Sequence, residues 1–287
     1  MEWERAKTYI LLFFVIVNVF LGGFLLMERR RYTVSNARQQ AIVEIMAQNN
    51  ITMDARILRR FPPMRLINVS GFYYDENELI EIFFGNATVG RSSNARGYVF
   101  THGQGELSIA HGFISYYNTS GHGGPGEWLT NVSRTEAQSL TDAFVGQHFS
   151  DFRLDDVDVF VDQGLIRFSY RQVYRGYVIH SNFVELIVTD RGIVQVDMQF
   201  GQILDMDRER HPIAAPDEVL LTFVQRVWQH ALISPMVVIH MDLVYFQDEG
   251  SPDPERPYRL EPFYRVFIAG DEGDPLLINA LTNEIIN

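Results

Sequence analysis

The stretch YILLFFVIVNVFLGGFLLM, residues 9–27, decides the first feature of the fold, because its nineteen residues include no charged side chain. A helix rises about 1.5 Å per residue, so this stretch would be roughly 28 Å long, close to the ~30 Å hydrocarbon core of a bilayer. A helix also satisfies its own backbone hydrogen bonds, which lipid cannot do. We therefore expect a transmembrane helix over residues 9–27, preceded by a short cytoplasmic head, residues 1–8.

A cleavable signal peptide is the competing interpretation of this stretch. Its apolar region would be about 7–15 residues long and would be followed by small residues at a cleavage site. Here the run is longer and leads into LLMERRR, residues 25–31. The pattern favours an uncleaved anchor.

One polar residue, Asn18, falls near the middle of the predicted span. A buried amide in lipid is costly unless it finds a hydrogen-bond partner, and small residues let a second helix approach closely. We expect a partner-binding face on this helix, with the alternative that Asn18 bonds back to its own helix and faces lipid. The predicted face consists of Leu11, Phe14, Asn18, Gly22, Gly23 and Leu25. Trp3 would lie at the membrane interface, where aromatic rings prefer to lie.

The orientation of the span rests on weaker signals. Arg5 and Lys7 precede it and three arginines follow it, so a literal count of basic residues would leave the larger part inside. The absence of cysteine suits an exported chain. Lys7 is the only lysine, and arginine keeps its charge at a more alkaline pH, although GC-rich coding would give the same bias. Our hypothesis is that residues 32–287 lie outside the cytoplasm.

Charge and composition exclude several classes of function. The first 31 residues hold five basic and three acidic side chains, which leaves 19 basic and 33 acidic ones and a net charge of −14 on the remainder. Binding to nucleic acid or to anionic headgroups requires clustered positive charge. Hydrophobic content of 46% and aromatic content of 13% predict a folded part of one large or two medium domains.

The first predicted domain, residues 32–127, begins with an amphipathic stalk helix that ends near Asn49 and is capped by Ser35 or Asn36. Strand-like runs follow at residues 64–74, 78–84, 97–101 and 106–117. The Gly- and Pro-rich loop at residues 118–127 predicts a domain boundary.

The second predicted domain, residues 128–287, contains two helices that each precede a set of strands. Ser133 and Glu136 form a capping box that opens a helix to His148, and Pro216 opens the other helix. Strands are expected at residues 155–161, 165–173, 177–189, 193–204, 237–246, 259–269, 276–280 and 284–286. The order favours an α+β fold, with helices packed on antiparallel sheet and with the last two units as duplicated modules.

Catalytic and metal-binding patterns are missing from the sequence. There is no cysteine, P-loop, HExxH, Gly-x-Ser-x-Gly or dinucleotide-binding glycine motif. The spacing of His102, His111 and His122 does not suit a metal site. The acidic run of residues 151–162 lacks the pattern of a calcium loop and is interpreted as a solvated face, with Asp156 and Asp158 on one side of a strand. We expect no enzyme activity, no metal and no cofactor.

The N-terminus resembles that of the YycI (WalI) regulatory proteins of Gram-positive bacteria. The matching positions are Met1-Glu2-Trp3, Lys7-Thr8 before the span, and Asn18 followed by Phe20-Leu21-Gly22 within it. Asn18 departs from the Asp of the family pattern and keeps the polarity without the charge.

The C-terminus resembles the last strands of PepSY-like modules. The residues concerned are PFYRVF at 262–267 and LINALTNEI at 277–285, where Asn283 stands in place of a glycine and can adopt the same left-handed turn. The two resemblances together cover about a fifth of the chain.

These resemblances imply a non-enzymatic protein of the cell membrane, with its N-terminus inside and its folded part outside. They imply two partners, a sensor histidine kinase of the WalK (YycG) type and a YycH-like accessory protein. Contacts between membrane helices would adjust kinase output in a two-component system that controls cell-wall metabolism. The alternative is an anchored module whose folded part binds an envelope peptide or glycan, with the span only as a tether.

Overall fold

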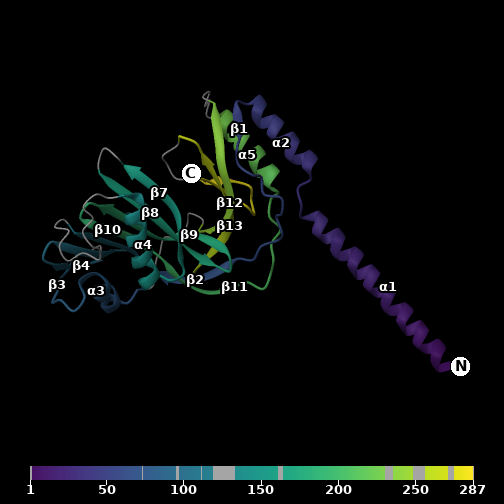
Figure 1. Ribbon diagram of the computed structural model, residues 1–287, viewed down its shortest axis with the longest axis horizontal. Helices are drawn as coiled ribbons and strands as arrows, with labels where there is room; N and C mark the ends of the chain where they lie inside the picture. Colours follow the sequence, from purple (N-terminus) through teal and green to yellow (C-terminus); the bar gives the residue numbers. More distant parts are fainter. Residues whose placement is uncertain are drawn as a thin grey trace.

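A computed structural model shows a long N-terminal helix that projects from an α+β folded part (Figure 1). The structure describes residues 2–72, 74–94, 97–110, 112–118, 133–160, 164–229, 235–247, 256–270 and 275–286. The predicted boundary loop therefore lies outside the described residues, except for Asn118.

The helices are α1 (Glu2–Arg31), α2 (Asn36–Gln48), α3 (Glu76–Phe84), α4 (Arg134–His148) and α5 (Pro216–Gln229). The strands are β1 (Ile51–Met53), β2 (Ile67–Phe72), β3 (Gly90–Asn94), β4 (Gly97–His102), β5 (Gly105–Ala110), β6 (Phe113–Asn118), β7 (Phe152–Phe160), β8 (Leu165–Tyr174), β9 (Tyr177–Thr189), β10 (Gly192–Gln199), β11 (Gly201–Met206), β12 (Met236–Phe246), β13 (Tyr258–Ile268), β14 (Leu276–Asn279) and β15 (Ile285–Ile286).

These strands form one hydrogen-bonded sheet with the main order β11-β2-β13-β12-β9-β10-β6-β5-β4-β3. Strands β8 and β7 extend it from β9, strands β14 and β15 extend it from β13, and β1 pairs with β12. The pairing is antiparallel, as expected, except at two places: β1 and β9 each run parallel to β12.

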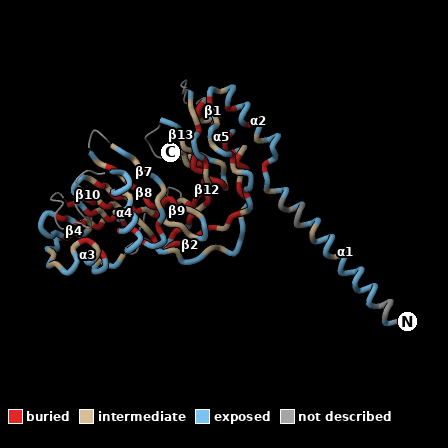
Figure 2. Tube along the Cα trace, in the orientation of Figure 1, coloured by how far each residue is buried: buried red, intermediate tan, exposed pale blue. Residues whose placement is uncertain are grey.

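Buried side chains gather in two separate hydrophobic cores (Figure 2). The first core is built by α2, α5, β1, β2 and β12–β14, and we name this part, residues 32–72 and 201–286, the stalk module. The second core is built by α3, α4, β4–β6 and β8–β10, and we name residues 76–200 the middle module. The two cores do not follow the predicted division at residue 127, because the stalk helix packs with the C-terminal elements.

The capped helices begin where their local signals predict. The side chain of Ser35 accepts a hydrogen bond from the Arg38 amide at the start of α2, and Ser133 and Glu136 form a complete capping box on α4. The helix α5 begins at Pro216, with acidic residues in its first turn.

The predicted strand at residues 78–84 is wrong, because these residues form helix α3. The carboxylate of Asp75 accepts hydrogen bonds from the amides of Asn77 and Glu78 and so caps the helix. Leu79 and Phe83, four residues apart, are then buried on one face.

Two predicted strands are each split in two. The run 106–117 becomes the hairpin β5–β6, with Gly112 in the turn at a φ of 80°. The run 193–204 becomes β10 in the middle module and β11 in the stalk module, with the break at Phe200.

Candidate functional site

The predicted partner-binding face lies on α1, which is long and apolar enough to cross a membrane. At about 1.5 Å per residue its 30 residues span about 45 Å. The window Lys7–Phe24 has a mean hydropathy of 1.9, and none of it is buried against the rest of the chain. Leu11 and Phe14 are 68% and 61% exposed. The whole apolar surface of this segment is therefore free for lipid or for a second helix.

Asn18 forms a hydrogen bond within its own helix. Its side-chain nitrogen donates to the carbonyl oxygen of Phe14 at 2.8 Å. This contact satisfies one of the two amide N–H groups, and an amide also has an acceptor oxygen. The intrahelical bond that was the alternative expectation is present, while the rest of the amide can still contact a partner.

The helical periodicity separates the two predicted glycines. At about 100° per residue, Gly22 lies about 40° from Asn18 around the axis, whereas Gly23 lies about 140° away on another face. A Cβ atom added at either glycine would meet no other atom within 4 Å. Leu25 lies on α1, but its side chain is outside the described set. Trp3 is 71% exposed, and the ammonium group of Lys7 lies 5.5 Å from its ring centroid.

A short hydrogen-bonded junction joins α1 to the stalk module. Thr33 forms an isolated antiparallel bridge with Arg60, and the amide of Val34 donates to the carbonyl of Arg59 at 2.9 Å. The rings of Tyr32 and Phe61 lie 6.1 Å apart in an edge-to-face contact. The chain is thus tied to the folded part within three residues of the end of α1, and α1 has no free linker.

A second site lies where the two modules meet, around the hairpin β8–β9. Tyr177 and Ile179 near the tip of this hairpin pack in the stalk module, and the Tyr177 ring lies 5.5 Å from that of Tyr245. Farther along the same strand, Val184 and Leu186 belong to the core of the middle module. The hairpin therefore passes from one hydrophobic core into the other.

Between the two cores the hairpin carries buried polar residues in an irregular stretch. Across β8 and β9, Arg171 pairs with Phe183 but the next residue, Gln172, pairs with Ile179. Residues 180–182 of β9 consequently have no partner on β8. All three are polar and at most 9% exposed: His180, Ser181 and Asn182.

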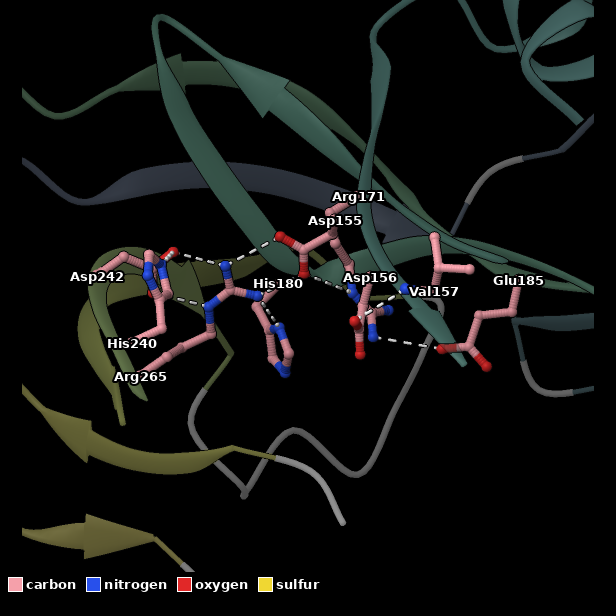
Figure 3. Close-up of polar contacts among 9 residues, drawn as sticks. All are labelled: Asp155, Asp156, Val157, Arg171, His180, Glu185, His240, Asp242 and Arg265. Atoms are coloured by element: carbon pink, nitrogen blue, oxygen red, sulfur yellow. Dashed lines mark hydrogen bonds and ion pairs between the residues drawn. The ribbon is translucent and has the colours of Figure 1, made fainter. Parts of the chain in front are cut away.

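Arg265 lies at the centre of this junction (Figure 3). Its side chain is 3% exposed and binds two carboxylates, one from each module. Asp242 of β12 accepts from Nε at 2.9 Å and from Nη2 at 2.6 Å, and Asp155 of β7 accepts from Nη1 at 2.6 Å and from Nη2 at 3.0 Å. Two carboxylates thus engage one planar guanidinium in a fork geometry, which suits arginine and not lysine.

A local irregularity of β7 directs Asp155 toward Arg265. The register of β7 against β8 shifts between Leu154 and Asp156, so Asp155 is the extra residue of a bulge. Bulges re-aim side chains in this way. The prediction of a solvated face is therefore wrong for Asp155, whose side chain is 17% exposed, whereas Asp156 and Asp158 do face one side of β7.

Further charged and aromatic groups extend the junction network into the middle module. Arg171 lies 3.9 Å from Asp155 and 3.3 Å from Glu185, and its guanidinium lies 5.0 Å from the ring centroid of Phe183. Nη1 of Arg265 lies 3.3 Å from Nδ1 of His180, which accepts a hydrogen bond when the proton is on Nε2.

The charges of the network shift the pKa values of its members. Burial lowers the pKa of His180, and the charges of Arg171 and Arg265 add to this effect, so that the pKa falls to about 3. Burial alone would raise the pKa of Asp155, but the hydrogen bonds and charge of Arg265 outweigh it and hold the pKa below its ordinary value. His180 is therefore neutral and Asp155 is ionised near neutral pH.

The middle module also has a sheet face opposite the one that α3 and α4 cover. Its cross-strand partners run Ser108, Ser115, Asp197, Glu185 and Ser169 across β5, β6, β10, β9 and β8. Asp197 accepts hydrogen bonds from Ser115 and Gln195. Phe113 and Tyr117 of β6 lie on the same face and are 39% and 49% exposed. This face combines carboxylates, hydroxyls and exposed rings.

The described residues contain no group of three His, Asp or Glu side chains that could hold a metal ion. His102 Nδ1 lies 3.1 Å from the carbonyl oxygen of Thr88, while His111 and His122 lie outside the described residues.

Comparison with known proteins establishes similarity of fold only. No protein-family model matches the chain, and no curated protein matches it. The chain is similar to the crystal structure of an uncharacterized protein from Eubacterium rectale ATCC 33656, with a TM-score of 0.57 and 11% sequence identity over 83% of this chain and 91% of that chain. It also matches the C-terminal domain of YpeB from Bacillus megaterium at 11% identity, over 76% of this chain and 97% of that one, with a TM-score of 0.41 that does not establish a common fold.

Proposed function

We propose that this protein is a single-pass, membrane-anchored regulator of a sensor histidine kinase, with α1 in the membrane and the folded part outside the cytoplasm. The observation that carries the proposal is α1 itself, whose apolar surface is entirely exposed and whose sequence resembles the N-terminus of YycI proteins. The partners are a kinase of the WalK (YycG) type and a YycH-like accessory protein. The proposal assigns no catalytic activity to the chain.

Contacts of α1 with kinase helices supply the regulation. Asn18 offers an amide oxygen, and Gly22 beside it lets a second backbone approach closely. Such an interhelical hydrogen bond contributes roughly 0.6–2 kcal/mol. A bias of one to two kcal/mol changes the ratio of two kinase states by about tenfold, which is the usual range of allosteric coupling.

The junction after α1 supports a role beyond anchoring. The contacts of Thr33 and Val34 with residues 59–60 leave little freedom between α1 and the stalk module. A rotation or displacement of the folded part is then passed to α1, and the reverse also holds. A flexible tether would not transmit such a change.

The test of this proposal separates the α1 sequence from simple anchoring. Residues 9–27 are exchanged for an unrelated transmembrane helix of equal length, and a reporter gene controlled by the kinase pathway is measured in living cells. The proposal predicts that the reporter changes as in a deletion strain while the folded part remains intact and membrane-bound. Retention of the original output with the exchanged span would overturn it.

Point variants sharpen this test. Gly22→Ile places a bulky side chain on the Asn18 face, and Gly23→Ile, about 140° from Asn18, is its matched control. Neither substitution meets another atom of the chain within 4 Å at the Cβ position. We expect only Gly22→Ile to alter the reporter output, and equal effects of the two variants would contradict a specific Asn18 face.

The polar sheet face of the middle module favours a second candidate function, the binding of an envelope glycan. Exposed Phe113 and Tyr117 can stack on sugar rings, and Asp197, which accepts from Ser115 and Gln195, can accept from sugar hydroxyls. The candidate predicts that cell-wall glycan fragments perturb NMR signals of the full chain in nanodiscs and that Tyr117→Ala abolishes the perturbation. Unchanged signals at millimolar glycan would contradict it.

A further inference from the structure

We propose that residues 180–182 of β9 are a hinge between the stalk module and the middle module, and that the Asp155–Arg265–Asp242 bridge is the latch that holds their present orientation. The hinge stands on the geometry of the junction alone. Only its last step, transmission to α1, rests on the proposed function.

The backbone at the junction is weakly paired. Strands β9 and β12 share one ladder pair, Tyr245 with Ile179, before the sheet continues within each module. Residues 180–182 are the stretch without partners on β8. A change of orientation therefore breaks few backbone hydrogen bonds here, whereas motion elsewhere in β9 would break the ladders with β8 and β10.

A buried hydroxyl points to a second arrangement of this stretch. Ser181 is 9% exposed, and its Oγ has no hydrogen-bond partner among the described residues. A buried polar group without a partner is unfavourable and rare in folded proteins. An orientation in which Ser181 reaches water or another polar group removes this cost, which lowers the energy difference between the two arrangements.

The latch explains why one arrangement is held. Arg265 and Asp242 belong to the stalk module and Asp155 belongs to the middle module, so the bridge crosses the hinge. Buried ion pairs add little stability compared with apolar packing, but the loss of one partner leaves an uncompensated charge. Removal of the Asp155 charge takes away the only one of these two carboxylates that ties the middle module to Arg265.

The latch is connected to α1 through β12. Val238 of that strand accepts hydrogen bonds from the amides of Asp54 and Ala55, both at 3.0 Å, next to the parallel ladder of β1. Four to six residues farther along the chain, the segment 59–61 is bonded to the residues that follow α1. A shift of β12 at Asp242 is thus passed through β1 to the junction with α1.

Spin-label distances in the full chain, reconstituted in nanodiscs, test the hinge. The chain has no cysteine, so pairs of introduced cysteines label cleanly. The pair Glu106→Cys and Leu221→Cys spans the modules, and the pair Leu204→Cys and Leu221→Cys lies within the stalk module; all three positions are exposed. The distance across the modules reports orientation, and the distance within the stalk module reports folding.

The latch variant is Asp155→Asn, and Asp156→Asn is the matched control on the same strand. The Asp156 carboxylate accepts from the amide of Val157 at 2.8 Å and faces away from Arg265 (Figure 3). We expect Asp155→Asn to add a second inter-module distance while the distance within the stalk module is unchanged. Asp156→Asn keeps the single wild-type distance. A single wild-type distance in folded Asp155→Asn overturns the latch.

Hydrogen exchange on the wild-type chain keeps the proposal testable if Asp155→Asn does not fold. The hinge predicts that amides 180–182 exchange about tenfold faster, or more, than amides 184–188 of the same strand, because they open without global unfolding. Equal exchange across β9 overturns the hinge. The kinase reporter separates the two proposals: a changed inter-module distance with an unchanged reporter overturns the coupling to the kinase and leaves the hinge standing.

Discussion

The buried imidazole of His180 makes the stability of the folded part depend on pH in a window that few other groups share. Its pKa is about 3 in the folded chain, against an ordinary value of 6.5, because of burial and then of the charges of Arg171 and Arg265. Between these two values the unfolded chain binds one more proton at this position than the folded chain does. The free energy of unfolding therefore falls as the pH is lowered below 6.5.

The magnitude follows from the pKa difference. One pKa unit corresponds to about 1.4 kcal/mol, so lowering the pH from 7 to 5 removes about 2 kcal/mol through His180 alone. Asp155 contributes in a different window. Its pKa is held below the ordinary 3.8, so its stabilising effect is lost only as the pH falls through that lower value. The range from pH 7 to 5 thus isolates the histidine.

The perturbation is His180→Asn, whose side-chain oxygen can accept from Arg265 in place of Nδ1 but does not titrate. Urea unfolding of the full chain in detergent micelles, followed by near-ultraviolet circular dichroism, gives the free energy at each pH. We expect the difference between wild type and variant to change by about 2 kcal/mol between pH 7 and pH 5. His240→Asn is the control, because its side chain is 60% exposed. Parallel pH curves for wild type and His180→Asn would refute the reasoning.

Three further variants test the packing and capping of the folded part by the same urea assay. In Gly201→Ala the added Cβ would lie 2.5 Å from Cγ1 of Val69, so we expect a loss of about 1–3 kcal/mol. Gly146→Ala on α4 meets nothing within 4 Å and is its control, with a gain of about 0.5–1 kcal/mol; equal effects would contradict the close approach at Gly201. Ser133→Ala removes the cap of α4 and should cost about 1 kcal/mol, and an unchanged midpoint would argue against the capping box. Phe168→Ala empties a fully buried site in the middle module and should cost about 3–5 kcal/mol, so a loss below 1 kcal/mol would contradict this core.

Local signals were sufficient for much of the fold. The apolar run of α1, the capping box at Ser133 and the proline at Pro216 each act within one or two turns of helix, so the sequence predicts those elements directly. The error at α3 has a local cause. Its apolar residues 79, 80, 82 and 83 suit a strand as well as a helix, and the cap at Asp75 was the signal that separates the two.

The junction between the modules could not be predicted from the sequence. Asp155 and Arg265 are 110 positions apart, and their contact depends on a bulge in β7 that no local pattern marks. Asp155 stands in an acidic run that is typical of a solvated surface, and burial of one member follows only from the packing of distant strands. The pairing of α2 with α5 through Arg38 and Asp217 is equally non-local.

The central claim, that α1 acts through contacts with a kinase in the membrane, is tested most directly by photocrosslinking from position 18 in living cells. A diazirine amino acid replaces Asn18, and mass spectrometry identifies what is captured. The account predicts capture of a sensor histidine kinase or its accessory protein from this position and a much lower yield from position 20, which lies about 160° around the helix. Lipid adducts alone, from a correctly inserted protein, would contradict it.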